Sequence, residues 1–315
     1  MSVQHFEYIP HIPVLLTECL DFLVQQTDGV YIDGTLGGGG HSEAILNRLE
    51  PTGLLYGIDQ DPEAHQAAGE RIGEDDRFHP LHGNFGHMVS LLPPESHGNI
   101  DGILFDLGVS THQIRERERG FSFQEDGPLD MRMGNLTSLT AANVVNEYSE
   151  QQIREILWQY GEERLGRPIA RAIVAARPLS TTGELAQIVR SVVKGPHQVK
   201  SLARVFQALR IEVNREMEML KKALEQALDL LKPNGILVAI SYHSLEDRLV
   251  KNFFKSGNFD GEIPKDFYGH SQAPLEPLHR KVIKPGKEEM NRNPAARSAR
   301  LRAASKRNPE DIPCG

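Results

Sequence analysis

Two aspartates stand at the ends of apolar runs, and glycines follow the first of them. Asp33 ends the run Gly29–Asp33 and precedes Gly34–His41, whose sequence is GTLGGGGH, while Asp59 ends the run Gly53–Asp59. Glycines between a strand and a helix let the backbone turn tightly and approach a ligand closely, and such a ligand lies at the carboxyl ends of the strands. A carboxylate just before the turn opposes a pyrophosphate and favours a cationic ligand.

The glycine pattern distinguishes two classes of cofactor. Dinucleotides place a pyrophosphate on the helix N-terminus and require G-x-G-x-x-G, but a pattern begun at Gly37 ends on Ser42, and one begun at Gly38 ends on Glu43. S-adenosylmethionine has no phosphate and carries a sulfonium cation, and Asp59 can accept both ribose hydroxyls of its adenosine from the end of the second strand. We therefore expect an S-adenosylmethionine site, and the alternative is a plain tight turn.

A third aspartate, Asp106, lies at the end of the apolar run Ile100–Leu107. An exocyclic base amine is a poor nucleophile because its lone pair is conjugated into the ring, so it needs an acceptor that orients it and takes up charge. We predict this role for Asp106, without a covalent intermediate; the alternative is an aspartate that caps a helix or anchors a loop. Phe85, which follows the third strand, either lines the adenine or is a core aromatic.

The elements that must position these side chains alternate between strand and helix. This order predicts an α/β fold with a doubly wound, mostly parallel sheet that is covered on both faces. Ser244 opens a further helix, with Asp247 as the acidic partner of a capping box. The expected strands are 29–33, 53–59, 77–81, 100–107 and 236–241, and the expected helices beside them are 17–25, 42–49 and a long one over 213–231.

The alternation stops near Ser110. Residues 115–212 have helical spacing, clearest in 149–159, 167–176 and 182–193, and no convincing strand. We therefore predict an inserted all-helical domain at 115–212, within a discontinuous domain formed by residues 1–114 and 213–315.

The loop Glu118–Met133 begins ERGFSF and ends DGPLDMRM. It could hold a flipped or unpaired base, with Phe121 or Phe123 stacking on that base and Arg132 meeting a phosphate. The alternative is a connector between domains whose aromatic side chains are packed away.

Composition limits the broad class of the protein. The chain has 315 residues, 25% of them charged, a net charge of −8 and no apolar run long enough to cross a bilayer, so we expect a soluble protein. Met1–Pro13 lacks the features of a secretion signal. The two cysteines, Cys19 and Cys314, form neither a disulfide framework nor a zinc site. We therefore expect a cytoplasmic protein without a metal. Arg280–Arg307 holds ten basic residues against two acidic ones, which predicts either a solvated tail or a phosphate-contacting arm.

Together these segments resemble the RsmH (MraW) family, the bacterial small-subunit rRNA cytosine-N4 methyltransferases. The resemblance covers nearly the whole chain, in order, and its loop and helix motifs are far more specific than a glycine loop. The segments that carry it are His11–Leu16, Tyr31–His41, Asp101–Ser110, Glu118–Met133, Tyr160–Arg164, Val205–Asn214, Ser241–Lys251 and Asn293–Arg302.

The resemblance implies a Rossmann-like class I methyltransferase fold with a helical insertion for RNA recognition. It also implies N4-methylation of a cytidine in 16S rRNA, at the decoding centre in the ribosomal P site, within the small ribosomal subunit. His41 and Gln113 enter as site residues through the resemblance alone. The implied cofactor-binding residues are Gly39, Gly40, His41, Asp59, Phe85, Asp106 and Gln113.

Three other functions remain as alternatives at this stage. A nicotinamide-dependent oxidoreductase would need the glycine pattern that is missing here. A ribosome-assembly factor with a decayed cofactor pocket would not be expected to keep Gly39, Gly40, His41 and Asp59. A DNA cytosine-N4 methyltransferase usually carries a Pro-Pro-aromatic motif after its fourth strand, where this chain has Asp106-Leu107-Gly108-Val109. Whether the protein is a monomer or a homodimer stays undetermined.

Overall fold

The computed structural model describes residues 12–308 and residue 310. The expectations that concern residues 1–11 and Cys314 lie outside the described residues. The chain divides into two compact units: unit 1 comprises Met1–Gly108 and Met217–Gly315, and unit 2 comprises Val109–Glu216. The sequence places these boundaries after residues 114 and 212, and the roles it assigns to the two parts stay predictions.

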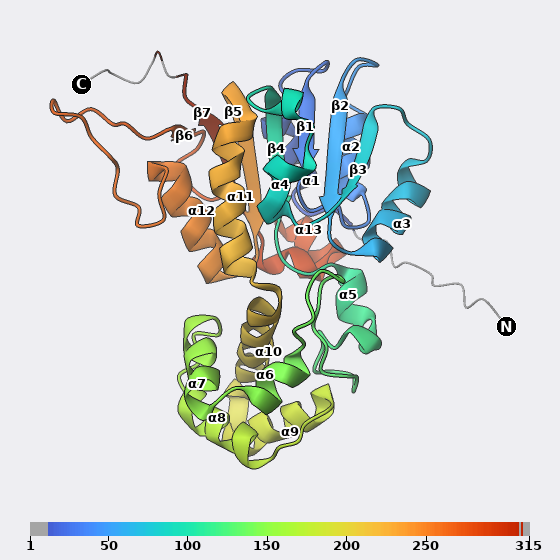
Figure 1. Cartoon of the computed structure of the whole chain (residues 1–315), viewed down its shortest axis with the longest axis vertical. Coiled ribbons are helices and arrows are strands. Elements are labelled where there is room, and N and C mark those ends of the chain that lie inside the picture. The colour runs from blue at the N-terminus through green and yellow to red at the C-terminus, as the bar shows by residue number, and fades with distance from the viewer. Residues whose placement is uncertain (1–11, 309, 311–315) are drawn as a thin grey trace. The chain divides into compact units, whose positions relative to one another are not determined.

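Unit 1 is built on one seven-stranded sheet with the strand order β3-β2-β1-β4-β5-β7-β6 (Figure 1). The first five strands are parallel, whereas β7 runs antiparallel to both of its neighbours. The strands are β1 Val30–Asp33, β2 Leu54–Asp59, β3 Phe78–His82, β4 Ile100–Asp106, β5 Leu231–Ser241, β6 Leu275–Pro277 and β7 Arg300–Lys306. The predicted doubly wound, mostly parallel sheet is confirmed.

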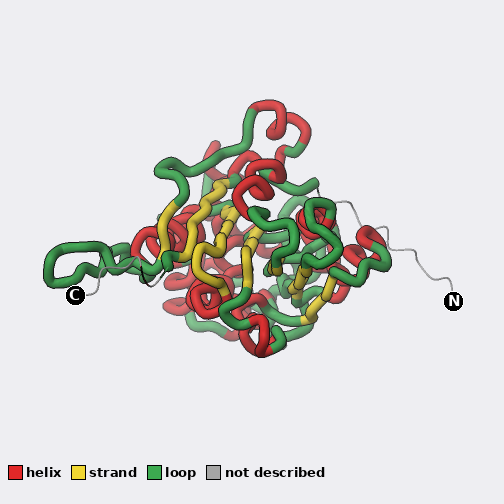
Figure 2. Tube along the Cα trace, turned by 90° about the horizontal axis from the view of Figure 1, so that it is seen from above, coloured by secondary structure: helices red, strands yellow, loops and turns green. Residues whose placement is uncertain are grey.

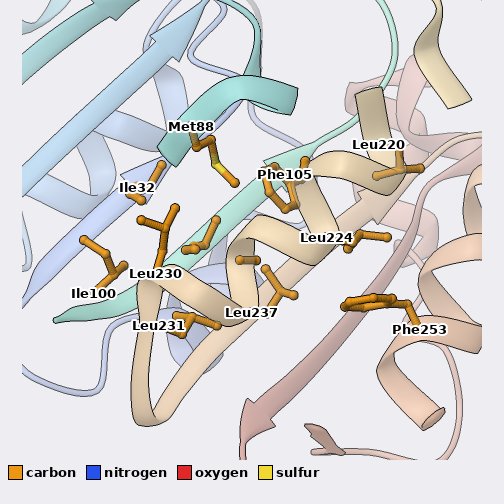
Figure 3. Packing of buried hydrophobic residues seen from close by; sticks show 14 of the residues in the cluster. Ile32, Met88, Ile100, Phe105, Leu220, Leu224, Leu230, Leu231, Leu237 and Phe253 are labelled. Carbon is orange, nitrogen blue, oxygen red and sulfur yellow. The ribbon is translucent and has the colours of Figure 1, made fainter. Parts of the chain in front are cut away.

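Successive residues of the central strands face opposite sides of the sheet, because side chains alternate along a strand. Phe105 on β4 belongs to the core cluster under α4 Met88–Leu91, α11 Glu216–Leu230 and α12 Ser244–Ser256 (Figure 3). Its neighbour Leu104 belongs to the cluster under α1 Leu16–Leu23 and α2 Gly40–Leu46. Seen from above, the strands form one band (Figure 2). The central strands β1, β2, β4 and β5 are mostly buried on both faces, which explains their continuous apolar sequence. Unit 1 also contains α3 Pro62–Ile72 and α13 Lys287–Arg292.

Unit 2 is helical, and none of its residues, all of which the structure describes, lies in a strand. One apolar core joins its longer helices through residues such as Val144, Ile153 and Val205. The helices are α5 Thr111–Arg115, α6 Ala141–Glu147, α7 Glu150–Gln159, α8 Gly166–Ala175, α9 Thr182–Val192 and α10 Gln198–Asn214.

The helix predicted over 213–231 is wrong at its start. α10 ends at Asn214 and α11 begins at Glu216, because Arg215 between them adopts a left-handed conformation with φ 50°. The apolar spacing continues across this residue, so the pattern does not reveal the break.

The capping box predicted for α12 is also wrong in its partners. His243 is the N-cap residue, and Glu246 is the acidic partner that bonds back to its backbone. Asp247 instead accepts hydrogen bonds from Arg300 and Arg302 on β7, both at 2.8 Å.

The basic segment Arg280–Arg307 is neither a solvated tail nor a free arm over its last part. Arg300–Lys306 forms strand β7, which pairs with β5, and Leu301, Ala303 and Ala304 of this strand are buried. Lys306 donates from Nζ to the carbonyl of Leu231 at 2.7 Å, so its ammonium group bonds within the protein. No helix in the described part of the chain is both long and apolar enough to span a membrane.

Candidate active site

The glycine loop connects β1 to α2 with two left-handed residues. Gly37 has φ 48° and Gly39 has φ 74°, and Gly39 is the N-cap residue of α2. A Cβ atom added to Gly40 would lie 2.5 Å from Cγ of Pro13, so only glycine fits there. The loop therefore presents backbone, rather than side chains, at the carboxyl end of the sheet.

Asp33 is buried at the end of β1 and is held by neutral donors. Its Oδ1 accepts from the Thr35 backbone N–H at 3.1 Å, and its Oδ2 accepts from the Ser42 hydroxyl at 2.7 Å. Burial raises the pKa of Asp33. No lysine or arginine within residues 12–308 forms an ion pair with it.

Asp59 at the end of β2 is held in the same way. Its Oδ2 accepts from the Gly37 N–H and its Oδ1 from the Asp61 N–H, both at 2.9 Å. Burial raises the pKa of Asp59 to about 6. Asp59 also lacks a lysine or arginine partner among the described residues, and its bond to Gly37 places the carboxylate against the glycine loop.

Asp106 ends β4, the strand beside β1 at the point where the strand order reverses. Its backbone N–H donates to the Thr35 hydroxyl at 2.6 Å, so the ends of β1 and β4 are joined. On its side chain, Oδ1 accepts from the Tyr242 hydroxyl at 2.8 Å, and Oδ2 lies 3.7 Å from Nδ1 of His41. Ligands of doubly wound sheets bind at such a reversal.

His41, in the first turn of α2, is 6% exposed. Its Nε2 lies 3.2 Å from the Val14 carbonyl, which can only accept, so Nε2 carries a proton and Nδ1 faces Asp106. Burial lowers the pKa of His41, and the buried Asp33 partly opposes that effect. The predicted residues Gly39, Gly40, His41, Asp59 and Asp106 thus lie around one end of the sheet.

Phe85 and Gln113 are the remaining predicted site residues. Phe85 is half-buried against the core of unit 1, with its ring centroid 5.7 Å from that of Phe105. Gln113 belongs to unit 2 and is buried, not a surface residue as its sequence context alone indicates. It completes a capping box with Ser110 and donates from Nε2 to the Met133 carbonyl at 3.3 Å.

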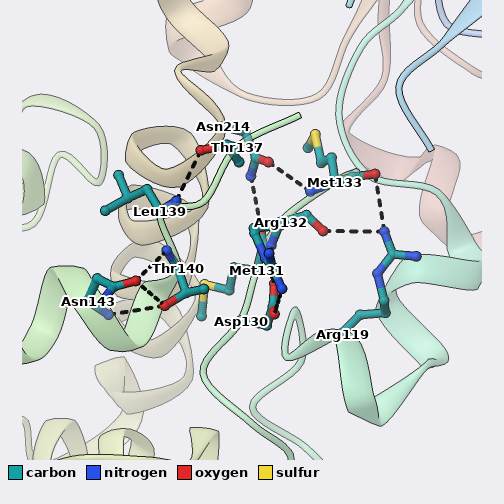
Figure 4. A network of polar contacts seen from close by, with 10 residues as sticks. All are labelled: Arg119, Asp130, Met131, Arg132, Met133, Thr137, Leu139, Thr140, Asn143 and Asn214. Carbon is teal, nitrogen blue, oxygen red and sulfur yellow. Dashed lines mark hydrogen bonds and ion pairs between the residues drawn. The ribbon is translucent and has the colours of Figure 1, made fainter. Parts of the chain in front are cut away.

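The loop Glu118–Met133 of unit 2 is held by a polar network (Figure 4). The Asn214 side chain accepts from the Met133 N–H and donates to the Met131 carbonyl, both at 2.8 Å. Arg132 pairs with Asp130 through two hydrogen bonds, of 2.8 Å and 2.6 Å, so the predicted phosphate contact would have to compete with this ion pair.

Phe121 and Phe123 are each half-buried. One side of each ring lies against the core of unit 2, and Phe123 contacts Phe206 edge-on, with centroids 5.3 Å apart. The base-stacking role of either ring, and the alternative in which both are packed away, stay predictions.

Tyr242 is the residue of this site that the sequence analysis missed. It directly follows β5, and the rule that singled out Asp33, Asp59 and Asp106 applies to it: a polar group just past a buried strand. Because tyrosine is aromatic, the sequence pattern includes it in the apolar run, and its hydroxyl group is not recognised as a site group.

The sequence comparisons all point to one family. The model of the MraW methylase family matches residues 8–307. A ribosomal RNA small subunit methyltransferase H from Phocaeicola vulgatus is 47% identical over 302 residues, which cover 95% of this chain and 98% of that protein. The protein of the same name from Flavobacterium johnsoniae is 47% identical over 299 residues, 94% of this chain and 97% of its own. Among solved structures, an rRNA methylase from Streptococcus thermophilus aligns over 93% of this chain and 94% of its own, at 11% identity and a TM-score of 0.40, which is too low to support a conclusion.

Proposed function

The chain belongs to the MraW methylase family, and on that premise we propose that it transfers the methyl group of S-adenosylmethionine to N4 of a cytidine in 16S rRNA. Methylation of small-subunit ribosomal RNA with this cofactor follows from the family and from the names of its relatives. The fold is accordingly the Rossmann-like class I methyltransferase fold. The cytosine N4 target, its place in the decoding centre at the P site and a cytoplasmic location are the finer parts of the proposal.

The observation that carries the proposal is the pair of carboxyl groups beside the glycine loop, of which Asp33 is buried and Asp59 is half-buried. S-adenosylmethionine supplies an electrophilic methyl group on a sulfonium cation. We propose that Asp59 accepts the ribose hydroxyls and that Gly39, Gly40 and His41 offer a close backbone surface to the cofactor. Because no lysine or arginine within the described residues forms an ion pair with Asp33 or Asp59, the site suits a cation and opposes a pyrophosphate.

Asp106 is the group that we assign to the base amine. In the reaction a C–N bond forms at the amine, the carbon–sulfur bond breaks with S-adenosylhomocysteine as the leaving group, and the amine releases one proton to solvent water. A carboxylate that accepts a hydrogen bond from the amine orients its lone pair and takes up the developing positive charge. His41 faces the same carboxylate as a neutral imidazole.

The remaining predicted contacts extend the proposal. Phe85 is proposed to border the adenine with the exposed part of its ring, and Gln113 to meet the cofactor from unit 2. Unit 2 is the proposed RNA-recognition part, and the partner is 16S rRNA within the small ribosomal subunit. We assign no metal to the reaction, because methyl transfer from a sulfonium needs only orientation and charge stabilisation.

The experiment that tests this proposal is methylation of small ribosomal subunits from a bacterial strain that lacks the enzyme. Tritium from labelled S-adenosylmethionine should appear in 16S rRNA, and digestion to nucleosides with mass spectrometry should identify N4-methylcytidine. Chromatography against authentic standards separates it from the isobaric C5-methylcytidine. Label on another base, or no label with a folded protein that binds the cofactor, would refute the proposed reaction.

Calorimetry separates the alternative enzyme class. We expect heat of binding with S-adenosylmethionine and none with NADH. Tight binding of NADH in place of S-adenosylmethionine would favour the oxidoreductase.

A further inference from the structure

Tyr242 donates its hydroxyl hydrogen to Oδ1 of Asp106 at 2.8 Å. The two residues follow adjacent parallel strands, since Asp106 ends β4 and Tyr242 comes directly after β5. The contact therefore depends on the register of the sheet and not on a flexible loop. A hydrogen bond to an ionised carboxylate is among the stronger ones that proteins make.

The backbone of Tyr242 is fixed from the other side by the start of α12. The N–H groups of Tyr242 and His243 donate to Oε2 of Glu246, at 2.8 Å and 3.2 Å. Glu246 is 2% exposed, so this capping arrangement is buried. Gly108, with φ 103°, passes beside the ring, and a Cβ there would lie 3.4 Å from Cδ2 of Tyr242. The ring is thus held between the chain after β4 and the helix cap.

Several titratable groups lie near the Tyr242–Asp106 pair. Burial and the Asp106 carboxylate raise the pKa of Tyr242 well above its ordinary value, so its hydroxyl stays a donor at neutral pH. The groups near the pair include His41 on α2, Cys19 on α1, Glu246 on α12 and Glu289 on α13.

We infer that Tyr242 is a positioning residue for methyl transfer: its hydroxyl holds the Asp106 carboxylate in the orientation that meets the base amine and favours the ionised form of that carboxylate. The inference rests on the proposed function, in which Asp106 accepts the hydrogen bond of the amine. It does not require Tyr242 to touch the substrate or the cofactor.

The test compares Tyr242→Phe with a matched control, Tyr31→Phe. Tyr31 is equally a tyrosine of unit 1 whose hydroxyl is bonded, but it donates at 2.7 Å to the backbone carbonyl of Gln26, before β1 and away from the strand ends that carry the site. Small subunits from the deficient strain serve as substrate. The measurements are kcat, KM for the subunits, cofactor affinity by calorimetry, and kcat between about pH 5 and pH 9.

For Tyr242→Phe we expect kcat to fall by about 10- to 100-fold, the range for losing a hydrogen bond to a charged group, with KM and cofactor affinity nearly unchanged. Because the lost donor favoured the ionised carboxylate, the acid limb of the kcat profile should move to higher pH. Tyr31→Phe should keep kcat and the position of that limb, even where its melting temperature falls.

Three results would each overturn a different part of the inference or of the proposed function. A Tyr242→Phe enzyme with wild-type kcat and an unmoved acid limb would overturn the role of Tyr242 while leaving the proposed function intact. A parallel loss in both variants, tracking their melting temperatures, would reduce Tyr242 to a structural residue. Absence of methyl transfer by the wild-type protein would instead overturn the proposed function, and the inference with it.

Discussion

The buried carboxylates of unit 1 fall into two groups that differ in how their charge is balanced. Asp247, on α12, accepts from the guanidinium groups of Arg300 and Arg302 on β7. Asp33 and Asp59, at the ends of β1 and β2, accept from backbone N–H groups and, for Asp33, from the Ser42 hydroxyl, and neither pairs with a lysine or arginine of the described residues. All three side chains are largely shielded from water, so the difference lies in their partners.

The pKa of the ion-paired Asp247 is lowered, whereas the pKa values of Asp33 and Asp59 are raised. Burial alone would raise the pKa of Asp247, but the hydrogen bonds from Arg302 and Arg300 outweigh it and lower that pKa. Burial raises the pKa of Asp33, and that of Asp59 to about 6, because their neutral donors compensate only in part. The first arrangement joins a helix to a strand. The second leaves two carboxyl groups without a lysine or arginine partner among the described residues, at the end of the sheet where we propose that the cofactor binds.

The largest expected effect concerns Asp106, which we place in the second group by function. Asp106→Ala removes the acceptor of the base amine, so kcat should fall by about 10²- to 10³-fold. Circular dichroism and the melting curve should remain close to those of the wild type. Turnover at the wild-type rate in a folded Asp106→Ala protein would remove this residue from the mechanism.

The next effect concerns cofactor affinity. Asp59→Asn keeps the size of the side chain but loses its charge and one acceptor oxygen, so Kd for S-adenosylmethionine should rise by about 10- to 100-fold. Calorimetry measures this directly. An unchanged Kd would show that the carboxylate at the end of β2 does not hold the cofactor.

Asp247→Asn is the counterpart from the ion-paired group. It leaves two guanidinium groups with a neutral partner, and we expect about 1–3 kcal/mol of lost stability in urea or thermal unfolding. Kd for S-adenosylmethionine should stay within about twofold, since the side chain binds β7 and not the cofactor. If Asp247→Asn were as stable as the wild type but bound the cofactor more weakly, the proposed difference between the ion-paired Asp247 and the carboxylates Asp33 and Asp59 would be wrong.

The smallest expected effect is a pH dependence of cofactor binding. As pH falls through about 6, Asp59 becomes protonated and can no longer offer two acceptor oxygens or a negative charge, so affinity falls by up to about tenfold per pH unit. Near pH 6, binding should release protons, because the bound cation favours the ionised carboxyl. Calorimetry in buffers of different ionisation enthalpy detects that release. Asp59→Asn should abolish it, and a wild-type affinity that is flat from pH 5 to pH 7 would contradict the assignment.

The features that the sequence predicts correctly are those with a strong local pattern. The strands that end at Asp33, Asp59 and Asp106 are continuous apolar runs, and they lie within one or two residues of their expected bounds. The glycine loop is predictable because left-handed residues favour glycine.

What could not be predicted depends on partners far along the chain. Strand β7 carries Arg300, Arg302 and Lys306, and it is a strand through its pairing with β5 and β6 and the ion pairs of its arginines with Asp247. The break at Arg215 is hidden by apolar spacing that continues through it. The spacing of Ser110 and Gln113 fits a capping box, but the bond from Gln113 to the Met133 carbonyl joins residues twenty apart, and no local pattern shows it.

The most direct test of the central claim is a crystal structure of the protein with S-adenosylmethionine. We predict the ribose hydroxyls within hydrogen-bond distance of the Asp59 carboxylate, about 2.6–3.2 Å, with the methyl group toward Asp106. Density for the cofactor away from the ends of β1, β2 and β4, or a pyrophosphate bound on the glycine loop in its place, would contradict the account.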